Sequence, residues 1–263
     1  MTISRASTKK SPWLLRLHTL FTYCFLYAPI AVLVLFSFNT DRRNASWQGF
    51  TLDWYYSLFH NEAVLRALGN SLKVGVAATL ISTVIGTMAA VGLSRFKFKG
   101  SGIIGKLVFV PLVVPEIVMG VSILTLFLSL GVKLSLITII LAHIAFCIAY
   151  VTITVRTRIA GLNPILEDAA ADLGATRWEA FRLVTLPQIM PGIISGALLC
   201  FTLSFDDFVI AFFNAGVGSS TLPMTIQSML KFGVTPEINA ISTIMLIASI
   251  TVLSVFAIFR FRR

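Results

Sequence analysis

Residues 167–187 read EDAAADLGATRWEAFRLVTLP and form a polar, amphipathic segment between two long apolar runs. Asn163 and Pro164 just before it predict a helix start, because asparagine accepts backbone N–H groups and proline suits the first helical position. Gly174 predicts the end of this helix, since glycine readily adopts the left-handed conformation found there. The segment therefore begins with a short helix that stops at a glycine turn.

A second helix is predicted within the same segment. Thr176 and Glu179 have the spacing of a capping box, which starts a helix. This helix carries apolar side chains, Trp178 among them, and we expect it to stop at Pro187, which lacks a backbone N–H. The two helices make a compact knob, residues 163–187. Docking to a partner protein suits this knob better than lying on the membrane, because its acidic side chains would face anionic headgroups.

The rest of the chain is strongly apolar. Of its 263 residues, 57% are hydrophobic and 12% are charged, and the mean hydropathy is +0.89. This composition is typical of a polytopic membrane protein and excludes an ordinary soluble domain. The net charge of +10 does not indicate a nucleic-acid partner, because Lys and Arg stand at the ends of apolar runs. The three cysteines lack ligand spacing, so no metal site is predicted.

Six apolar runs are long enough to cross the roughly 30 Å hydrocarbon layer of a membrane. We therefore expect an all-α protein whose six transmembrane helices cover about residues 14–38, 70–94, 103–130, 134–157, 188–215 and 238–260. Residues 14–260 then form one transmembrane domain that includes the knob, between a cytoplasmic N-terminus (1–13) and a cytoplasmic C-terminus (261–263). Pro111 and Pro115 break the helix of the third run, either to line a cavity or as a packing kink.

The distribution of Lys and Arg predicts the orientation. Of the 21 such residues, 15 lie in one set of loops and terminal segments, and the other 6 lie in the opposite set. The positive-inside rule places the richer set in the cytoplasm, and with it both termini and the knob. The sequence contains no GxxxxGK[ST] phosphate-binding loop, so we expect this chain to bind no ATP and to be no enzyme.

The knob carries the positions of a family motif. Its spacing resembles the EAA loop of type I ABC importer permeases, except that an Asp replaces the family's Glu and Val184 replaces its usual Ile. The motif positions are Asp168, Ala169, Ala170, Gly174, Leu186 and Pro187. The resemblance implies the MetI-like six-helix architecture and a cytoplasmic ABC ATPase dimer docked on this loop and on Trp178. It also implies that this chain holds no cofactor, because that ATPase would bind ATP and Mg²⁺.

Further short motifs narrow the resemblance to one group of permeases. They are Ser46–Phe50, Trp54–Tyr55, Pro115–Met119, Leu203–Asp207 and Pro236–Ala240. In this order they resemble the second permease of spermidine/putrescine ABC transporters, over almost the whole chain. The resemblance implies import of polyamines across the bacterial inner membrane. It implies as partners a periplasmic polyamine-binding protein, a homologous second permease and membrane lipid, and no nucleic acid.

Carboxylates inside the predicted spans agree with a cationic substrate. Glu116 and Asp206 fall near the middle of their spans, without Lys or Arg at the same depth. Such carboxylates are costly in a membrane unless water, a partner or a cation accompanies them. A polyamine also needs aromatic faces, which attract ammonium groups. The expected substrate-pathway residues are Trp47, Glu116, Ser204, Phe205, Asp206 and Asp207.

Each of these assignments has a structural alternative. Asp206 and Asp207 are about 100° apart on a helix, so one of them can bond a neighbouring span instead of facing the pathway. Trp47 suits an interfacial anchor as well as a substrate gate. Ser204 suits a hydrogen bond to its own backbone. We expect His143, a polar residue in the fourth span, to be a neutral core histidine rather than a proton relay.

The sequence leaves other functions open. A permease of the same family for an iron chelate, sulfate or an organophosphonate would need positive groups in mid-membrane, where this chain has acids. An ion-coupled secondary transporter is disfavoured by the knob and by the lack of an inverted repeat. A passive cation channel would conduct without a partner. The second permease is either a homologue or another copy of this chain.

Overall fold

The structure, a computed structural model, describes residues 12–42, 46–96, 99–163 and 165–261. Most of the expected cytoplasmic N-terminus lies outside the described residues, as do Pro164 of the expected helix start and residues 262–263 of the expected C-terminus. The described chain is helical, apart from an isolated antiparallel bridge between Asn39 and Phe50. The expected all-α fold is therefore confirmed for the described residues.

The chain divides into two compact units, residues 1–60 with 229–247 and residues 61–228 with 248–263. In the first unit, α1 (Pro12–Phe36) is followed by a loop and by α2 (Asp53–His60). The buried side chain of Asn39 accepts the backbone N–H of Gln48 at 2.9 Å. Trp54 donates its indole N–H to the Asn39 carbonyl at 2.8 Å. The loop after α1 is thus ordered by its own hydrogen bonds. The last long helix, α12 (Pro236–Phe261), begins in this unit and ends in the second.

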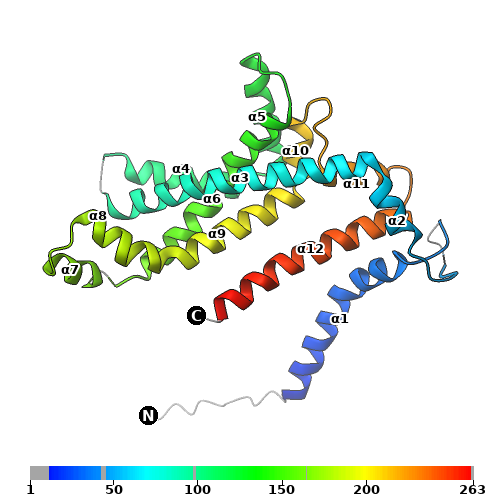
Figure 1. The fold of residues 1–263 in the computed structure, drawn as a ribbon, viewed down its shortest axis with the longest axis horizontal. Coiled ribbons are helices and arrows are strands. Elements are labelled where there is room, and N and C mark those ends of the chain that lie inside the picture. Colours follow the sequence, from blue (N-terminus) through cyan, green and yellow to red (C-terminus); the bar gives the residue numbers. More distant parts are fainter. Residues whose placement is uncertain (1–11, 43–45, 97–98, 164, 262–263) are drawn as a thin grey trace, which may run out of the picture. The chain divides into compact units, whose positions relative to one another are not determined.

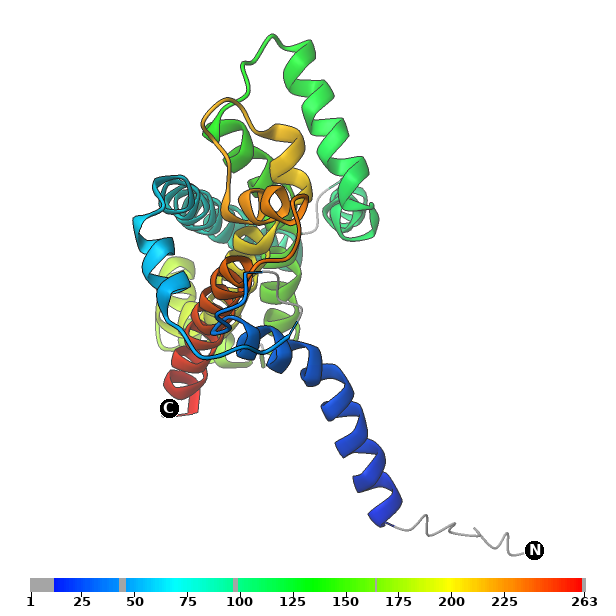
Figure 2. The ribbon, with the colours of Figure 1, turned by 90° about the vertical axis from the view of Figure 1, so that its right-hand side faces the viewer.

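Three long helices form the core of the second unit: α3 (Glu62–Arg95), α6 (Leu136–Ala160) and α9 (Leu186–Asp206). They pack against one another, and Figures 1 and 2 show them side by side. Val151 of α6 is fully buried between glycines of the other two helices. A Cβ at Gly86 would lie 2.8 Å from the Val151 side chain, and one at Gly196 would lie 3.3 Å from its Cα. Small residues therefore allow the close approach that membrane helices use.

Two of the six predicted spans are interrupted. The run 103–130 forms α4 (Ser101–Val113) and α5 (Glu116–Ser129), which meet at an angle of 111°. This break was predicted, although it falls at Pro115 and not at Pro111, which lies inside α4, whereas the break in the run 188–215 was not predicted. Pro115 precedes α5 and cannot donate a backbone N–H to continue α4. The run 188–215 forms α9 and α10 (Val209–Asn214), because Asp207 leaves the helical conformation. Helix α11 (Leu222–Leu230) follows α10.

The described residues contain four helices that are long and apolar enough to cross a membrane. They are Trp13–Phe36, Glu62–Arg95, Leu136–Ala160 and Arg177–Asp206. If the bent pair α4 and α5 counts as one span, the described residues contain five candidate spans. Pro236–Thr251 is a shorter apolar helix. The fold is therefore that of a multi-pass membrane protein.

The knob consists of α7 (Ile165–Asp172), α8 (Arg177–Ala180) and a π-helical turn at 181–185 that leads into α9. The glycine turn is confirmed, since Gly174 has a φ of +89°. The predicted stop at Pro187 was wrong, because the helix runs on to the end of α9. The wider π turn shifts the backbone bonds, so that Leu186 donates to the carbonyl of Phe181 and the proline is accommodated just after it.

The knob and α10 mark opposite ends of the second unit. Helices α7 and α8 lie where α3 ends and α9 begins, whereas α10 lies where α9 ends (Figure 1). Each end contains a pair of acidic residues adjacent in sequence, Glu167 with Asp168 and Asp206 with Asp207. These two ends are the candidate functional regions.

Candidate functional site

The break between α9 and α10 is held open by Asp207. Its carboxylate accepts the backbone N–H of Ala211 at 2.8 Å and that of Ile210 at 3.4 Å. These N–H groups belong to the first turn of α10 and have no partner within that helix. An aspartate that follows the last residue of α9 therefore starts a new helix rather than extending the old one, and it leaves Asp206 at the end of α9.

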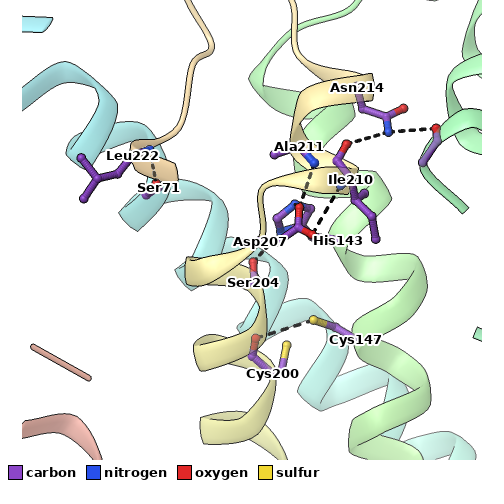
Figure 3. A network of polar contacts seen from close by, with 11 residues as sticks. Ser71, His143, Cys147, Cys200, Ser204, Asp207, Ile210, Ala211, Asn214 and Leu222 are labelled. Carbon is purple, nitrogen blue, oxygen red and sulfur yellow. Dashed lines mark hydrogen bonds and ion pairs between the residues drawn. The ribbon is translucent and has the colours of Figure 1, made fainter. Parts of the chain in front are cut away.

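A buried polar network surrounds Asp207 (Figure 3). Nε2 of His143 in α6 lies 3.2 Å from the carboxylate Oδ2 of Asp207, and the two side chains are 0% and 5% exposed. Nδ1 of His143 lies 2.7 Å from the hydroxyl oxygen of Ser204. Of the two adjacent acids, Asp207 is thus the one that contacts a neighbouring helix.

Beside this network lies a cavity of about 330 Å³. Three carboxylates line it: Glu116 from the first turn of α5, Asp206 and Asp207. Its lining also includes aromatic residues of α6 and of the α9–α10 junction, namely Phe146, Tyr150 and Phe208. No Lys or Arg is among the described residues that line it. The arrangement gives a small acidic and aromatic cavity, which we call the acidic cavity.

The other three expected pathway residues lie elsewhere. Ser204 is buried and contacts His143, and Phe205 is buried with its ring 5.7 Å from that of Phe201. Trp47 belongs to the first unit, where its half-exposed ring meets Phe36 edge-on at 6.3 Å. The cavity therefore brings together the three predicted acids. The predicted residues Ser204 and Phe205 do not line the cavity and take part in helix packing instead.

No group of three or more His, Cys, Asp or Glu side chains is placed to hold a metal ion within the described ranges. Both Cys147 and Cys200 are buried in the core of the second unit, and Cys24 is exposed on α1. The chemistry of the cavity is therefore that of carboxylates and aromatic rings.

At the opposite end, the knob exposes most of the expected motif residues. The exposed ones are Asp168, Ala169, Gly174, Trp178 and Pro187, whereas Ala170 and Leu186 are partly buried. Leu173, just before the glycine turn, is 90% exposed and adds an apolar tip that the sequence analysis did not single out. The capping box is confirmed, since Thr176 and Glu179 bond each other's backbone N–H groups. The knob thus presents a surface of mixed apolar and charged character.

The knob is fastened to α3 by three side chains that we call the clasp: Arg95, Glu167 and Thr185. Arg95 at the end of α3 forms an ion pair with Glu167 of α7 and donates to the hydroxyl of Thr185 at 2.7 Å. Thr185 donates in turn to Glu167. The Arg95 guanidinium also lies 5.5 Å from the ring centre of Phe181. This clasp was not predicted, because nothing in the sequence links a residue of α3 to the acid beside Asp168.

A groove of about 680 Å³ runs between the end of α3 and the knob. The clasp residues Arg95 and Glu167 line it, together with Asp168, Phe96 and Trp178. Asp168 therefore faces open space, while its sequence neighbour Glu167 is paired.

Comparison with known proteins identifies the family to which this chain is similar. The sequence matches, over residues 82–262, the family described as binding-protein-dependent transport system inner membrane component. It is 43% identical over 244 residues to the putrescine transport system permease protein PotI of Escherichia coli strain K12, covering 90% of this chain and 86% of that protein. It is 41% identical over 228 residues to the spermidine/putrescine transport system permease protein PotC of Haemophilus influenzae, covering 87% of this chain and 89% of that protein.

A solved structure shows the same fold. It is that of a bacterial ABC transporter involved in the import of the acidic polysaccharide alginate, with a TM-score of 0.75. The similarity covers 95% of this chain and 94% of that chain at 17% sequence identity, so it concerns the fold alone.

The chain belongs to the family of binding-protein-dependent transport system inner membrane components. It is a permease subunit of an ABC transport system, not an enzyme, and it is a multi-pass protein of the bacterial inner membrane. The family resemblance read from the sequence motifs is thereby confirmed.

Proposed function

We propose that this chain is one of two permease subunits of an ATP-driven importer of polyamines such as putrescine and spermidine. The observation that carries the proposal is the acidic cavity, where carboxylates of α5, of α9 and of the α9–α10 junction meet without Lys or Arg among the described lining residues. The names of the relatives PotI and PotC, at 43% and 41% identity, support the same substrate class.

The chemistry of the cavity fits a polyamine better than the other candidate cargoes. Ammonium groups bind carboxylates, and aromatic rings attract cations at their faces. Glu116 and Asp206 supply the charges, while Tyr150 and Phe208 supply rings around the same space. An anionic cargo such as sulfate or an organophosphonate would meet uncompensated negative charge in a poorly hydrated site.

The orientation and domain organisation expected from the sequence belong to this proposal. Residues 14–260 cross the membrane six times, with α4 and α5 together as the third span and α12 as the sixth, and both termini are cytoplasmic. The excess of Lys and Arg on the side of the knob supports this arrangement. The acidic cavity then lies toward the periplasmic ends of the spans, and the knob lies in the cytoplasm.

The partners follow from this orientation. A periplasmic binding protein delivers the polyamine to the outer loops, and a homologous second permease completes the pathway. A cytoplasmic ATPase dimer, which binds ATP and Mg²⁺, docks on the knob at Trp178 and the exposed acid Asp168. The glycine turn and the clasp on α3 connect the knob to the long helices, so that a push on the knob moves them together.

The acidic cavity acts as a transient cation site in this cycle. Closure of the ATPase dimer would switch the permease pair between outward-open and inward-open states. A ligand shifts such an equilibrium only through a difference in affinity between the two states, so the cavity must bind the polyamine weakly in at least one of them.

The test is uptake of labelled spermidine by cells that make the whole complex. We expect competition by other polyamines and none by sulfate, an organophosphonate or an iron chelate. Uptake should be lost in a strain whose ATPase subunit is deleted. Competition by an anion but not by polyamines would refute the substrate class, and uptake without the ATPase would refute the mechanism.

A further inference from the structure

One buried ring next to the acidic cavity takes no part in the proposed cation site. His143 is 0% exposed, with Nε2 3.2 Å from Oδ2 of Asp207 and Nδ1 2.7 Å from the oxygen of Ser204 (Figure 3). Histidine is the side chain that most readily gains a proton near neutral pH. The ring therefore stands where it can supply a positive charge to Asp207.

The carboxylate of Asp207 is buried and accepts hydrogen bonds from the backbone. Two N–H groups, those of Ile210 and Ala211, donate to it. The side chain is 5% exposed, so water compensates little of its charge. The other ionisable side chains near it are the acids Glu116 and Asp206 and the phenol of Tyr150, which line the same cavity, and the buried thiol of Cys147. A counter-charge beside a buried anion among like charges lowers the cost of burying that anion.

We propose that His143 is not the neutral core histidine expected from the sequence but the imidazolium counter-ion of Asp207, and that it thereby sets the charge of the substrate pathway. This inference rests on the proposed function. The pair is neutral as a whole, so that only Glu116 and Asp206 of the three cavity carboxylates act on the substrate. This chain then offers two negative charges, which match two ammonium groups of a polyamine. His143 touches no substrate and acts through Asp207 as a positioning residue.

Loss of the imidazolium should change which amine the transporter prefers. Without it, Asp207 adds a third negative charge to the pathway, and a triamine gains more from that charge than a diamine. With an effective dielectric constant near 20 and a separation of about 10 Å, the expected change in preference is about tenfold. A merely structural role of His143 would lower the uptake of both amines alike.

The experiment measures Vmax/KM for putrescine and for spermidine in the complete transporter. His143→Gln, which keeps a hydrogen-bonding side chain without the charge, should shift the ratio about tenfold toward spermidine. Ser204→Ala removes the Nδ1 contact without changing the charge and should leave the ratio as in the wild type. The double variant His143→Gln/Asp207→Asn should restore the wild-type ratio. An unchanged ratio in His143→Gln would overturn the proposal.

If His143→Gln does not accumulate in the membrane, a comparison of Asp207→Asn with Asp206→Asn tests the proposed charge of His143 instead. Asp207→Asn keeps an oxygen that can accept the N–H of Ala211, so α10 retains its start. Its ratio of putrescine to spermidine transport should stay within about twofold of the wild type, even if total uptake falls, because the pair was already neutral. Asp206→Asn removes an acting charge and should shift the ratio toward putrescine. Equal shifts in the two variants would contradict the proposal.

The charge of the ring can also be measured without transport. The chain has three histidines, so ¹⁵N-histidine NMR of the complex, with His143→Gln to assign the signal, reports on this ring. We expect both ring nitrogens of His143 to be protonated in the wild type, and a neutral ring in Asp207→Asn. A neutral ring in the wild type would refute the inference. Failure of the wild type to import either amine would instead refute the proposed function.

Discussion

At each of the two ends of the second unit, one acid of an adjacent pair lies beside a basic side chain of another helix, but the basic side chain differs between the ends. At the knob, Glu167 is paired with Arg95 of α3, and its neighbour Asp168 faces the groove. At the acidic cavity, Asp207 is paired with His143 of α6, and its neighbour Asp206 faces the cavity. In each case one acid of an adjacent pair fastens two helices together, and the other is left for a partner or a ligand.

The difference lies in how far each pair is removed from water. The side chains of Arg95 and Glu167 are 27% and 34% exposed, so solvent screens their attraction and a permanently charged arginine is tolerated. The His143–Asp207 pair is almost fully buried. A buried pair is costly unless its charges balance, and histidine can adjust its charge to its surroundings. The same arrangement, an acid paired with a basic side chain of another helix, thus fastens the knob at one end and sets the charge of the cavity at the other.

The largest effect is expected at the knob, from Gly174→Val. The φ of +89° is strained for a β-branched residue by on the order of 1–3 kcal/mol, so the turn between α7 and α8 should change shape. Uptake should fall by a factor of about 5 to 100, since this strain corresponds to factors of that order. Gly161→Val is the matched control, because Gly161 has a φ of −91° in the same loop. Survival of both uptake and ATPase association in Gly174→Val would disprove the role of the knob.

Neutralising the exposed acid at either end should separate the two functions. Asp206→Asn removes one cavity charge and should lower polyamine uptake about tenfold while ATPase association stays as in the wild type. Asp168→Asn should weaken ATPase association and leave the KM for the amine unchanged. Co-purification with the ATPase and initial uptake rates measure the two effects. If Asp206→Asn transports with normal kinetics, Asp206 does not belong to the pathway.

The clasp should contribute a smaller, measurable stability. A partly exposed ion pair with an added hydroxyl contact is worth about 1 kcal/mol. In detergent, Arg95→Gln and Glu167→Gln should each lower the Tm by roughly 2 °C, and the double variant should lower it no further. Arg182→Gln, an exposed arginine of the π turn, serves as the control. Additive losses in the double variant would show that Arg95 and Glu167 do not act together.

The smallest functional effect is expected from cysteine substitutions that test on which side of the membrane each end of the second unit lies. Single cysteines replace Leu173 at the knob and Val217 at the opposite end, both of which are fully or nearly fully exposed, in a background in which Cys24 is changed to Ser. Uptake should be unchanged for Val217→Cys, whereas Leu173→Cys, which lies on the proposed docking surface, need only accumulate in the membrane. A membrane-impermeant maleimide should label position 217 in intact cells and position 173 after permeabilisation. Labelling of position 173 in intact cells would overturn the orientation.

Local features of the knob were predictable because they depend on neighbouring residues. The left-handed Gly174 and the capping box of Thr176 and Glu179 follow from backbone conformation and hydrogen bonding within one turn. The stop at Pro187 was not predictable in the same way. Proline breaks an ordinary α-helical ladder, but a preceding π turn moves the ladder, and no residue pattern announces such a turn.

The sequence by itself determined the class of the molecule. Long apolar runs can be stable only in a membrane, and the motif of the knob identifies the family of permeases. It also predicted acids within the long apolar runs, because positions along a run are a matter of counting.

The tertiary structure alone decided which acid of each adjacent pair is engaged. Arg95 is 72 residues from Glu167, and Ser204 of the Asp207 network is 61 residues from His143. Helical periodicity fixes only that adjacent side chains point about 100° apart. Which direction meets a cation depends on how α3, α6 and α9 pack, and that packing arises from contacts between residues that are distant in the chain.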